Sequence, residues 1–161
     1  MIDSHVELYI PADIDVLGVF QVVTVKIEPG EHGHVFQEFK DINALPEDSG
    51  RRVITTGGHF GYLKIAEGCD KHCTYCIIPS LRGKFRSVPE ERLLKQAEYM
   101  ASQGVRELIL VAQETTVYGT DLYGKKTLHI LLKKLCQIKG IRWIRVLYCY
   151  PEEIYDELIQ V

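Results

Sequence analysis

The fold is decided by residues 62–76, which read YLKIAEGCDKHCTYC. The apolar segment 62–66 predicts a strand, and it leads directly into Cys69, Cys73 and Cys76, which have the spacing C-x3-C-x2-C. Three thiolates this close along the chain can bind three irons of a 4Fe-4S cubane, and without a fourth cysteine in the loop one iron stays open to another ligand. An open iron indicates that chemistry takes place at the cluster.

Two other uses of clustered cysteines fit the sequence less well. Zinc normally takes four ligands, so a zinc site would need His72, which is the neighbour of Cys73 and is poorly placed to complete the same tetrahedron. A disulfide framework is disfavoured because the chain has five cysteines, an odd number, and because residues 1–5 lack the basic and apolar segments of a secretion signal. We therefore expect a reducing compartment and a cytoplasmic location.

Composition indicates a globular chain with one main domain. The 161 residues are 46% apolar, which is ordinary for a protein with a hydrophobic core. Nineteen Lys and Arg against 22 Asp and Glu give a net charge of -3, so the overall charge does not indicate a nucleic-acid-binding surface. No apolar run approaches the roughly 18 residues of a membrane span. We expect neither a membrane nor a nucleic acid as partner.

The chain divides into two unequal parts. Residues 43–52 are polar, contain both proline and glycine, and follow neither a helical nor a strand period, which is typical of a linker. The linker separates a small N-terminal segment, residues 1–42, from the main domain, residues 53–161. In the N-terminal segment, residues 19–27 are rich in β-branched side chains and predict one strand.

The first helix of the main domain is predicted to follow the cysteine loop. Residues 87–90, Ser-Val-Pro-Glu, resemble a capping box with Pro89 in the first turn. Gly104 fits the left-handed residue that often ends a helix. The apolar side chains expected on one face of this helix are Leu93, Leu94, Ala97, Met100 and Ala101.

The rest of the domain repeats the alternation of strand and helix. A second strand is predicted over residues 105–112, whose continuously apolar centre suits a parallel strand covered on both faces. A second helix ends at Gly140, a third strand follows over residues 141–149, and a third helix starts at Pro151. The second helix has its apolar side chains at Leu128, Leu131, Leu132, Leu135 and Ile138.

This alternation predicts an α/β fold of three βα units around a parallel sheet. In such folds the reactive site lies beyond the carboxyl ends of the strands. The cysteine loop follows the first strand, Gln113 and Glu114 follow the second, and residues 148–151 follow the third. We therefore expect all three segments on one rim of the sheet.

At the level of motifs, the cysteine loop resembles that of radical S-adenosylmethionine (SAM) enzymes, with the aromatic Tyr75 just before the last cysteine. Its flanks, residues 63–69 and 76–87, resemble the methylthiotransferases within that superfamily. Residues 109–124 and 142–151 are similar to the RimO type, which modifies an aspartate of a small-subunit ribosomal protein. The related type that acts on tRNA adenosine tends to carry an L-G-Q-N-V-N-like stretch at 109–124, which this chain lacks.

The resemblance implies the first three βα units of a radical SAM partial TIM-type barrel, preceded by residues 1–42 as a remnant of the N-terminal methylthiotransferase domain. It implies methylthiolation of the β-carbon of the ribosomal aspartate, with an electron donor such as flavodoxin or ferredoxin. The family's second cluster, its three N-terminal cysteines and the later strands are not encoded, so we expect an interior fragment that does not complete the reaction alone. The alternatives are a tRNA adenosine methylthiotransferase and an inactive cluster-binding remnant.

The resemblance also assigns roles to residues. Cys69, Cys73 and Cys76 would bind the 4Fe-4S cluster, whose open iron would hold SAM. Tyr75 would flank the adenine of SAM, although it could instead pack the loop. Gln113 and Glu114 could bind the amino group of SAM or the substrate, or could serve the start of a helix.

Several basic residues and cysteines near this site have roles that the sequence defines less specifically. Lys71, Arg82, Lys84 and Arg86 could balance the charge of an anionic cluster and ligand, or could form a solvated loop. Cys136, close to the apolar stripe of the second helix, is predicted to be a small core side chain. Cys149 ends the third predicted strand close to the site, and the sequence assigns it no role.

Overall fold

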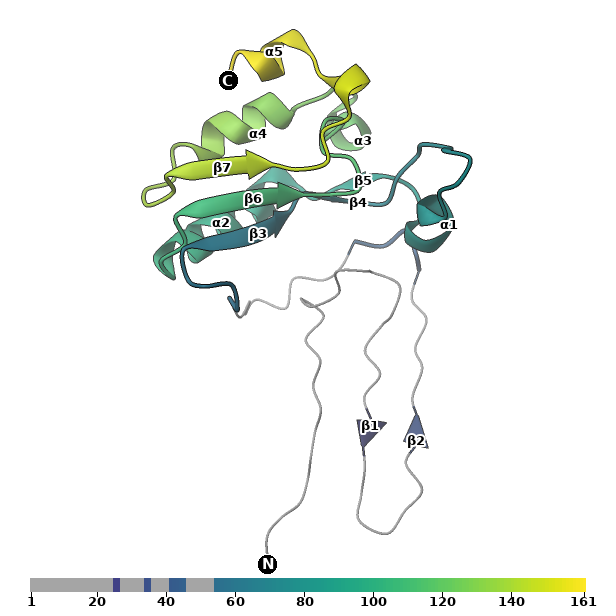
Figure 1. Ribbon diagram of the computed structural model, residues 1–161, viewed down its shortest axis with the longest axis horizontal. Helices are drawn as coiled ribbons and strands as arrows, with labels where there is room; N and C mark the ends of the chain where they lie inside the picture. Colours follow the sequence, from purple (N-terminus) through teal and green to yellow (C-terminus); the bar gives the residue numbers. More distant parts are fainter. Residues whose placement is uncertain (1–24, 27–33, 36–40, 46–53) are drawn as a thin grey trace, which may run out of the picture. The chain divides into compact units, whose positions relative to one another are not determined.

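The computed structural model describes residues 25–26, 34–35, 41–45 and 54–161 (Figure 1). Backbone contacts divide the chain into two units, Met1–Ala44 and Leu45–Val161, which are described separately. In the first unit, β1 (Val25–Lys26) pairs antiparallel with β2 (His34–Val35). β1 falls within the predicted strand 19–27, whose other residues, like most of the predicted linker, lie outside the described residues. The domain boundaries therefore stay a prediction.

The second unit contains the predicted parallel sheet. Its three strands are β3 (Phe60–Lys64), β6 (Glu107–Val111) and β7 (Trp143–Val146), and both neighbouring pairs in the order β3-β6-β7 are parallel. The strands lie side by side in Figure 1. The α/β prediction with three strands joined by helical crossovers is confirmed.

Two strands are shorter than predicted, and each has a local reason. The N-H of Val105 donates to the carbonyl of Met100 at 3.1 Å, so this residue closes the end of the preceding helix instead of starting the strand. Tyr148 has φ 59°, in the left-handed region that ends an extended strand, and it cannot continue β7.

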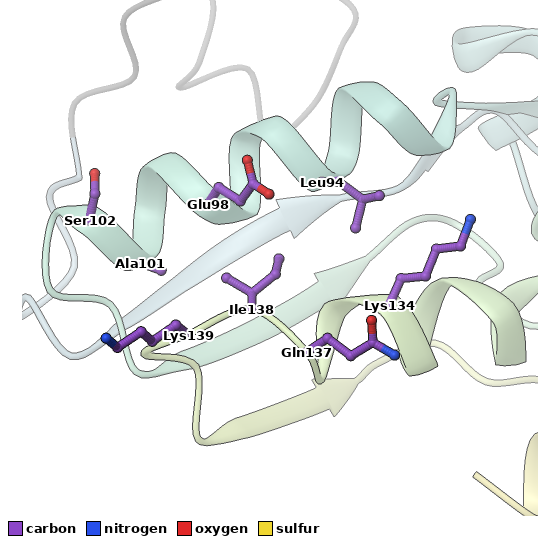
Figure 2. Close-up of a pocket in the computed structure, with 8 residues that line it drawn as sticks. All are labelled: Leu94, Glu98, Ala101, Ser102, Lys134, Gln137, Ile138 and Lys139. Carbon is purple, nitrogen blue, oxygen red and sulfur yellow. The ribbon is translucent and has the colours of Figure 1, made fainter.

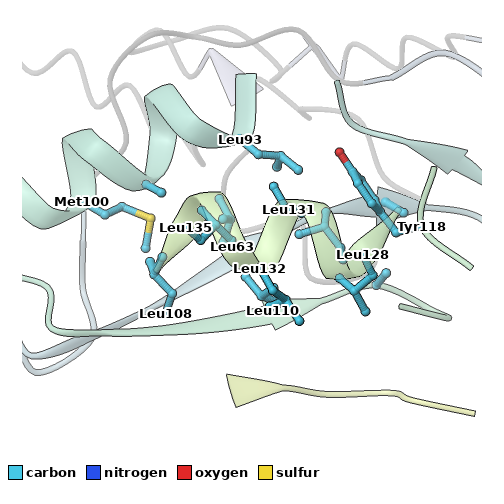
Figure 3. Packing of buried hydrophobic residues seen from close by; sticks show 14 of the residues in the cluster. Leu63, Leu93, Met100, Leu108, Leu110, Tyr118, Leu128, Leu131, Leu132 and Leu135 are labelled. Atoms are coloured by element: carbon cyan, nitrogen blue, oxygen red, sulfur yellow. The ribbon is translucent and has the colours of Figure 1, made fainter. Parts of the chain in front are cut away.

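Two helices cover one face of the sheet. They are α2 (Glu90–Ser102) and α4 (Leu128–Leu135), and their apolar stripes meet the sheet in one core, as Figure 3 shows. α4 ends before the predicted Gly140, and Ile138 packs against the core from the turn that follows it. The fully buried side chains of this core include Leu63, Leu93, Leu108, Leu110, Leu128, Leu131 and Leu135.

The predicted capping box is wrong. Pro89 occupies the N-cap position of α2, and no side chain caps the helix. Ser87 belongs to a short strand, β5 (Arg86–Ser87), where its hydroxyl accepts a hydrogen bond from the N-H of Gly119 at 2.9 Å. Its own N-H donates to Asp121 Oδ2 at 2.8 Å. Ser87 therefore joins β5 to the loop that follows β6, because a tertiary partner satisfies the polar groups that the motif would have used locally.

The remaining elements were not predicted as they occur. β4 (Ala66–Glu67) pairs antiparallel with β5, and α1 (Ile78–Arg82) lies between them in the chain. α3 (Thr120–Tyr123) precedes α4. The predicted third helix is a 3-10 turn, Pro151–Glu153, followed by α5 (Asp156–Ile159). Within the described residues, no helix has the length and apolar character needed to cross a bilayer.

Candidate functional site

The predicted site residues gather at one end of the sheet. β3 leads through β4 into the cysteine loop, and Gln113 and Glu114 follow β6. Figure 1 shows β4, β5 and α1 beyond the carboxyl ends of β3 and β6. Hydrogen bonds from Thr115 N to Tyr148 O at 3.1 Å and from Tyr150 N to Glu114 Oε1 at 3.4 Å bring the segment after β7 to the same rim. The expected rim is therefore present.

The three cysteines lie in one loop with free thiols. Cys69 and Cys76 are half-buried and Cys73 is exposed. The N-H of Cys69 donates to Gly83 O at 3.2 Å, and the N-H of Cys76 donates to Cys73 O at 3.0 Å. In the part of the chain that the structure describes, no group of three or more His, Cys, Asp or Glu side chains is close enough to hold a metal ion. The three thiols suit an iron-sulfur cluster chemically, and their ligand role stays a prediction.

Gly68 allows the two arms of this loop to approach each other. It has φ 78°, and a Cβ on it would lie 2.6 Å from the carbonyl carbon of Lys84 and 2.7 Å from Gly83 O. Two residues after Gly68, Asp70 Oδ1 accepts a hydrogen bond from the N-H of Phe85 at 3.0 Å. Only glycine fits both the backbone angle and the space directly before Cys69.

Glu67 is the central buried charge of the rim. Its side chain pairs with Arg82 at 3.3 Å and with Lys64, and Oε1 accepts hydrogen bonds from Gly68 N at 3.3 Å and from Gln113 Nε2 at 3.1 Å. Burial alone would raise the pKa of Glu67, but the hydrogen bond and charge of Lys64, with the charge of Arg82, outweigh it and hold the pKa below its ordinary value. Glu67 is therefore ionised and joins β4, α1 and the segment after β6.

Glu67 was not among the site residues predicted from the sequence. Its signal was a lone carboxylate at the end of an apolar strand-like run, which calls for a buried partner. The partner, Arg82, is 15 residues further along. Because Arg82 is buried in this pair, the solvated-loop reading is wrong for that residue.

Gln113 and Glu114 have different environments although they are neighbours. Gln113 donates to Glu67, and its Oε1 is buried without a hydrogen-bond partner among the described residues. Glu114 is 4% exposed, and its Oε1 accepts hydrogen bonds from the N-H and hydroxyl of Thr116 and from the N-H of Tyr150. Gln113 thus has a free acceptor, whereas Glu114 is engaged within the protein.

Lys71 lies in the cysteine loop and reaches the other two segments of the rim. Its Nζ is 3.6 Å from Glu114 Oε2 and 3.2 Å from Glu153 Oε1, and it lies 3.8 Å from the centroid of the Tyr150 ring. Partial desolvation would lower the pKa of Lys71, but the hydrogen bond and charge of Glu153 and the charge of Glu114 raise it. Lys71 therefore stays protonated and contacts the segments after β6 and β7.

The remaining candidates lie at the surface. Tyr75 is 91% exposed, so its ring does not pack the loop. Cys149 is exposed, with its Sγ 3.5 Å from Thr115 Oγ1. Cys136 is exposed too, so its prediction as a core side chain is wrong: helix α4 ends at Leu135, and the residue that follows it points away from the core.

A separate hollow of about 700 Å³ lies between α2 and α4 (Figure 2). It contains none of the predicted site residues, and it lies on the helical layer instead of the rim where α/β enzymes place their chemistry. Its lining residues are Leu94, Glu98, Ala101, Ser102, Lys134, Gln137, Ile138 and Lys139.

Comparison with protein families gives a match to the Radical SAM superfamily over residues 63–161. Three parallel βα units within this match fit the predicted beginning of a partial TIM-type barrel. A solved structure with some likeness is the radical S-adenosylmethionine methyltransferase TsrM from Kitasatospora setae, with cobalamin and a [4Fe-4S] cluster bound. It is 19% identical with a TM-score of 0.48, covering 64% of this chain and 20% of that one, which is too weak a likeness to support an argument.

Several curated relatives are named ribosomal protein uS12 methylthiotransferase RimO. The protein from Lachnoclostridium phytofermentans is 60% identical over 142 residues, which is 88% of this chain and 32% of that protein. The protein from Clostridium botulinum strain Eklund 17B is 54% identical over 140 residues, with 87% and 31% covered. The protein from Clostridium perfringens strain SM101 is 60% identical over 113 residues, with 70% and 25% covered. This chain spans about a third or less of these relatives' length.

Proposed function

The chain belongs to the radical SAM superfamily, and from this membership we propose that it is the cluster-binding part of a methylthiotransferase that acts on a ribosomal protein. The observation that carries the proposal is the position of the C-x3-C-x2-C loop at the rim of a parallel sheet, within a stretch 54–60% identical to proteins named RimO. The superfamily implies a 4Fe-4S cluster and SAM as cofactors. The proposed reaction is that of the longer relatives, to which this chain would contribute the matched part.

Cys69, Cys73 and Cys76 are the proposed ligands of the cluster. A bound cluster would supply the electron that splits the sulfonium bond of SAM and so begins hydrogen abstraction at the substrate. The chain's own contribution is to hold three thiolates and to leave one iron without a protein ligand. The hydrogen bond from Cys69 N to Gly83 O helps fix the position of the first of these ligands.

Gln113 is the proposed contact for the amino group of SAM. The ionised Glu67 can only accept hydrogen bonds, so the amide nitrogen of Gln113 must face it, and the amide oxygen is left free. A buried carbonyl oxygen without a partner is costly, whereas an ammonium group would satisfy it. This supports a cationic group of the cofactor at Gln113. The prediction that Glu114 also contacts the cofactor or substrate stays a prediction.

Tyr75 is the proposed neighbour of the adenine of SAM. Its ring is exposed and lies directly before Cys76 in the chain, so it could stack on a flat ligand bound at the cluster without any rearrangement of the core.

The substrate we propose is an aspartate of the small-subunit ribosomal protein uS12, after the names of the relatives. An electron donor such as flavodoxin or ferredoxin and a cytoplasmic location follow from that assignment. The relatives are named for a ribosomal protein, so the tRNA adenosine alternative is not favoured.

The cluster assignment is tested by anaerobic reconstitution followed by iron and sulfide analysis. The wild-type chain should bind about four irons in one oxygen-sensitive cluster. Cys73→Ala should lose the cluster. Cys136→Ala, which removes an exposed thiol directly after α4, is the matched control that should keep it. A full iron content in Cys73→Ala together with loss in Cys136→Ala would refute the ligand assignment, and a single bound zinc would refute the cluster.

The substrate assignment is tested on a peptide that carries the target aspartate of uS12. After incubation with SAM and reductant, mass spectrometry would detect an added methylthio group. We expect none from the 161-residue chain alone, and product from a version completed with the rest of a RimO protein. Modification of a tRNA adenosine by the completed enzyme would overturn the substrate assignment.

A further inference from the structure

The residues on either side of Cys69 are held by two neighbouring residues of another segment. Glu67 lies two positions before Cys69 and accepts a hydrogen bond from Gln113. Lys71 lies two positions after Cys69 and pairs with Glu114. The segment that follows β6 therefore contacts the loop at two points that flank the first proposed ligand.

We infer that Gln113 and Glu114 form a brace, together with Glu67 and Lys71, that positions the cysteine loop before any cofactor binds. The inference rests on the proposed function, because positioning the loop has a role only if its thiols bind a cluster. Within the brace the four residues act as positioning residues, through the backbone on either side of Cys69. Gln113 does so with its amide nitrogen, and its free Oε1 remains the proposed contact for SAM.

Burial separates the two halves of the brace. Glu67 and Arg82 are 5% and 6% exposed, so the Gln113 half is anchored inside the protein. The Lys71 half is more accessible, with 28% of the lysine side chain exposed. Ion pairs in such a setting hold geometry more than they add to overall stability. The Lys71 half can therefore be removed without unfolding the core.

Lys71 also extends the brace to the third strand. Its contacts with Glu153 and with the Tyr150 ring join the cysteine loop to the segment after β7. Glu114 supports the same connection, because its Oε1 accepts a hydrogen bond from the N-H of Tyr150. The loops after all three parallel strands are thus connected through one lysine and one glutamate.

Lys126 provides a matched control. Its Nζ pairs with the same Glu153 at 2.8 Å and lies 5.5 Å from the ring of Tyr155, so it makes an ion pair and a ring contact as Lys71 does. Among the described residues, Lys126 contacts Glu153 and Tyr155 and does not reach the cysteine loop. Lys126→Met therefore removes a comparable lysine without removing the brace.

The test is amide hydrogen exchange in the cluster-free chain, read at the hydrogen-bonded N-H groups of Cys69 and Cys76. Lys71→Met should speed exchange there by about tenfold, the effect of losing one hydrogen bond to a charged group, here the bond to Glu153. Glu114→Gln, which removes only the ion pair at 3.6 Å, should speed exchange at the same amides by a smaller factor. Lys71→Arg should restore slow exchange, and Lys126→Met should change it by less than about twofold. Exchange in α4 should stay unchanged in the Lys71 variants. If Lys71→Met does not fold, the partly exposed change Glu153→Gln, which removes the charge of the hydrogen-bond partner of Lys71, should give an increase at the same amides.

A second readout uses the reconstituted cluster. Lys71→Met should bind as much iron as the wild type but lose its cluster faster in air and show a broader electron paramagnetic resonance signal. Equal exchange in Lys71→Met and Lys126→Met, with iron bound normally by the wild type, would refute the brace. A wild-type chain that binds no iron, combined with faster exchange in Lys71→Met, would instead refute the proposed function and leave the brace standing.

Discussion

The helix-covered core and the cysteine loop of this protein are stabilised in different ways. In the core, many apolar side chains on β3, β6, α2 and α4 are fully buried, and each contributes through contact area (Figure 3). The loop from Glu67 to Ser87 is held by a few directed contacts, among them the Glu67 and Arg82 pair and the close approach at Gly68. The core is therefore stabilised by contact area shared among many side chains, whereas the loop depends on a few specific contacts.

The largest expected effect is in the core. Leu110→Ala removes a fully buried side chain at the centre of β6 and leaves a cavity, which should lower the free energy of unfolding by about 2 to 5 kcal/mol. Leu122→Ala makes the same chemical change on α3, where the side chain is 43% exposed, and should cost less than about 1 kcal/mol. Urea unfolding followed by circular dichroism measures both. Similar losses in the two variants would contradict the assignment of the core.

This difference explains what the sequence predicts well. The stripe Leu93, Ala97 and Met100 recurs with the helical period, and the run Leu108 to Val111 is continuously apolar, so periodicity locates both elements. The order of these strands and helices in turn predicts the fold, because short right-handed crossovers leave few alternative topologies.

The parts that were missed depend on partners distant in sequence. The sequence around Ser87 predicts a helix cap, but in the structure the Ser87 hydroxyl accepts a hydrogen bond from the N-H of Gly119. The importance of Glu67 depends on its contacts with Arg82 and Gln113, which only the folded chain brings close to it. The cysteine spacing predicts the candidate site, because the three proposed ligands are close along the chain. The contacts of Glu67 with Arg82 and Gln113 join residues far apart in the sequence, so periodicity does not predict them.

A smaller loss of stability, but a larger loss of site geometry, is expected at Gly68. Gly68→Ala should cost about 1 to 2 kcal/mol for the left-handed backbone, and the new Cβ would also displace the carbonyl of Lys84. Gly124 has φ 68° with nothing within 4 Å of a Cβ, so Gly124→Ala pays only the backbone cost. Both are measured by urea unfolding and by iron content after reconstitution. We expect reduced iron in Gly68→Ala alone, and normal iron there would show that the loop tolerates separation of its arms.

The smallest expected effect is a pH dependence at Glu153. Hydrogen bonds from Lys126 and then Lys71 hold the pKa of Glu153 below its ordinary value of 4.5. A carboxyl whose pKa is lowered by folding stabilises the folded state above its unfolded pKa, and this contribution is lost as pH falls through the folded pKa. Because Glu153 is partly exposed, the contribution should stay below about 1 kcal/mol.

The measurement compares urea unfolding of the wild type and Glu153→Gln across acidic pH. The difference in unfolding free energy should be constant above pH 4.5 and should shrink below it, since the protonated glutamate resembles the glutamine. Glu98→Gln, an exposed change on α2, is the control that should show no such trend. A difference that grew on acidification would mean that Glu153 does not hold Lys71 and Lys126 as a carboxylate. Glu114 and the ring of Tyr150 would then be the contacts that hold Lys71 in the loop.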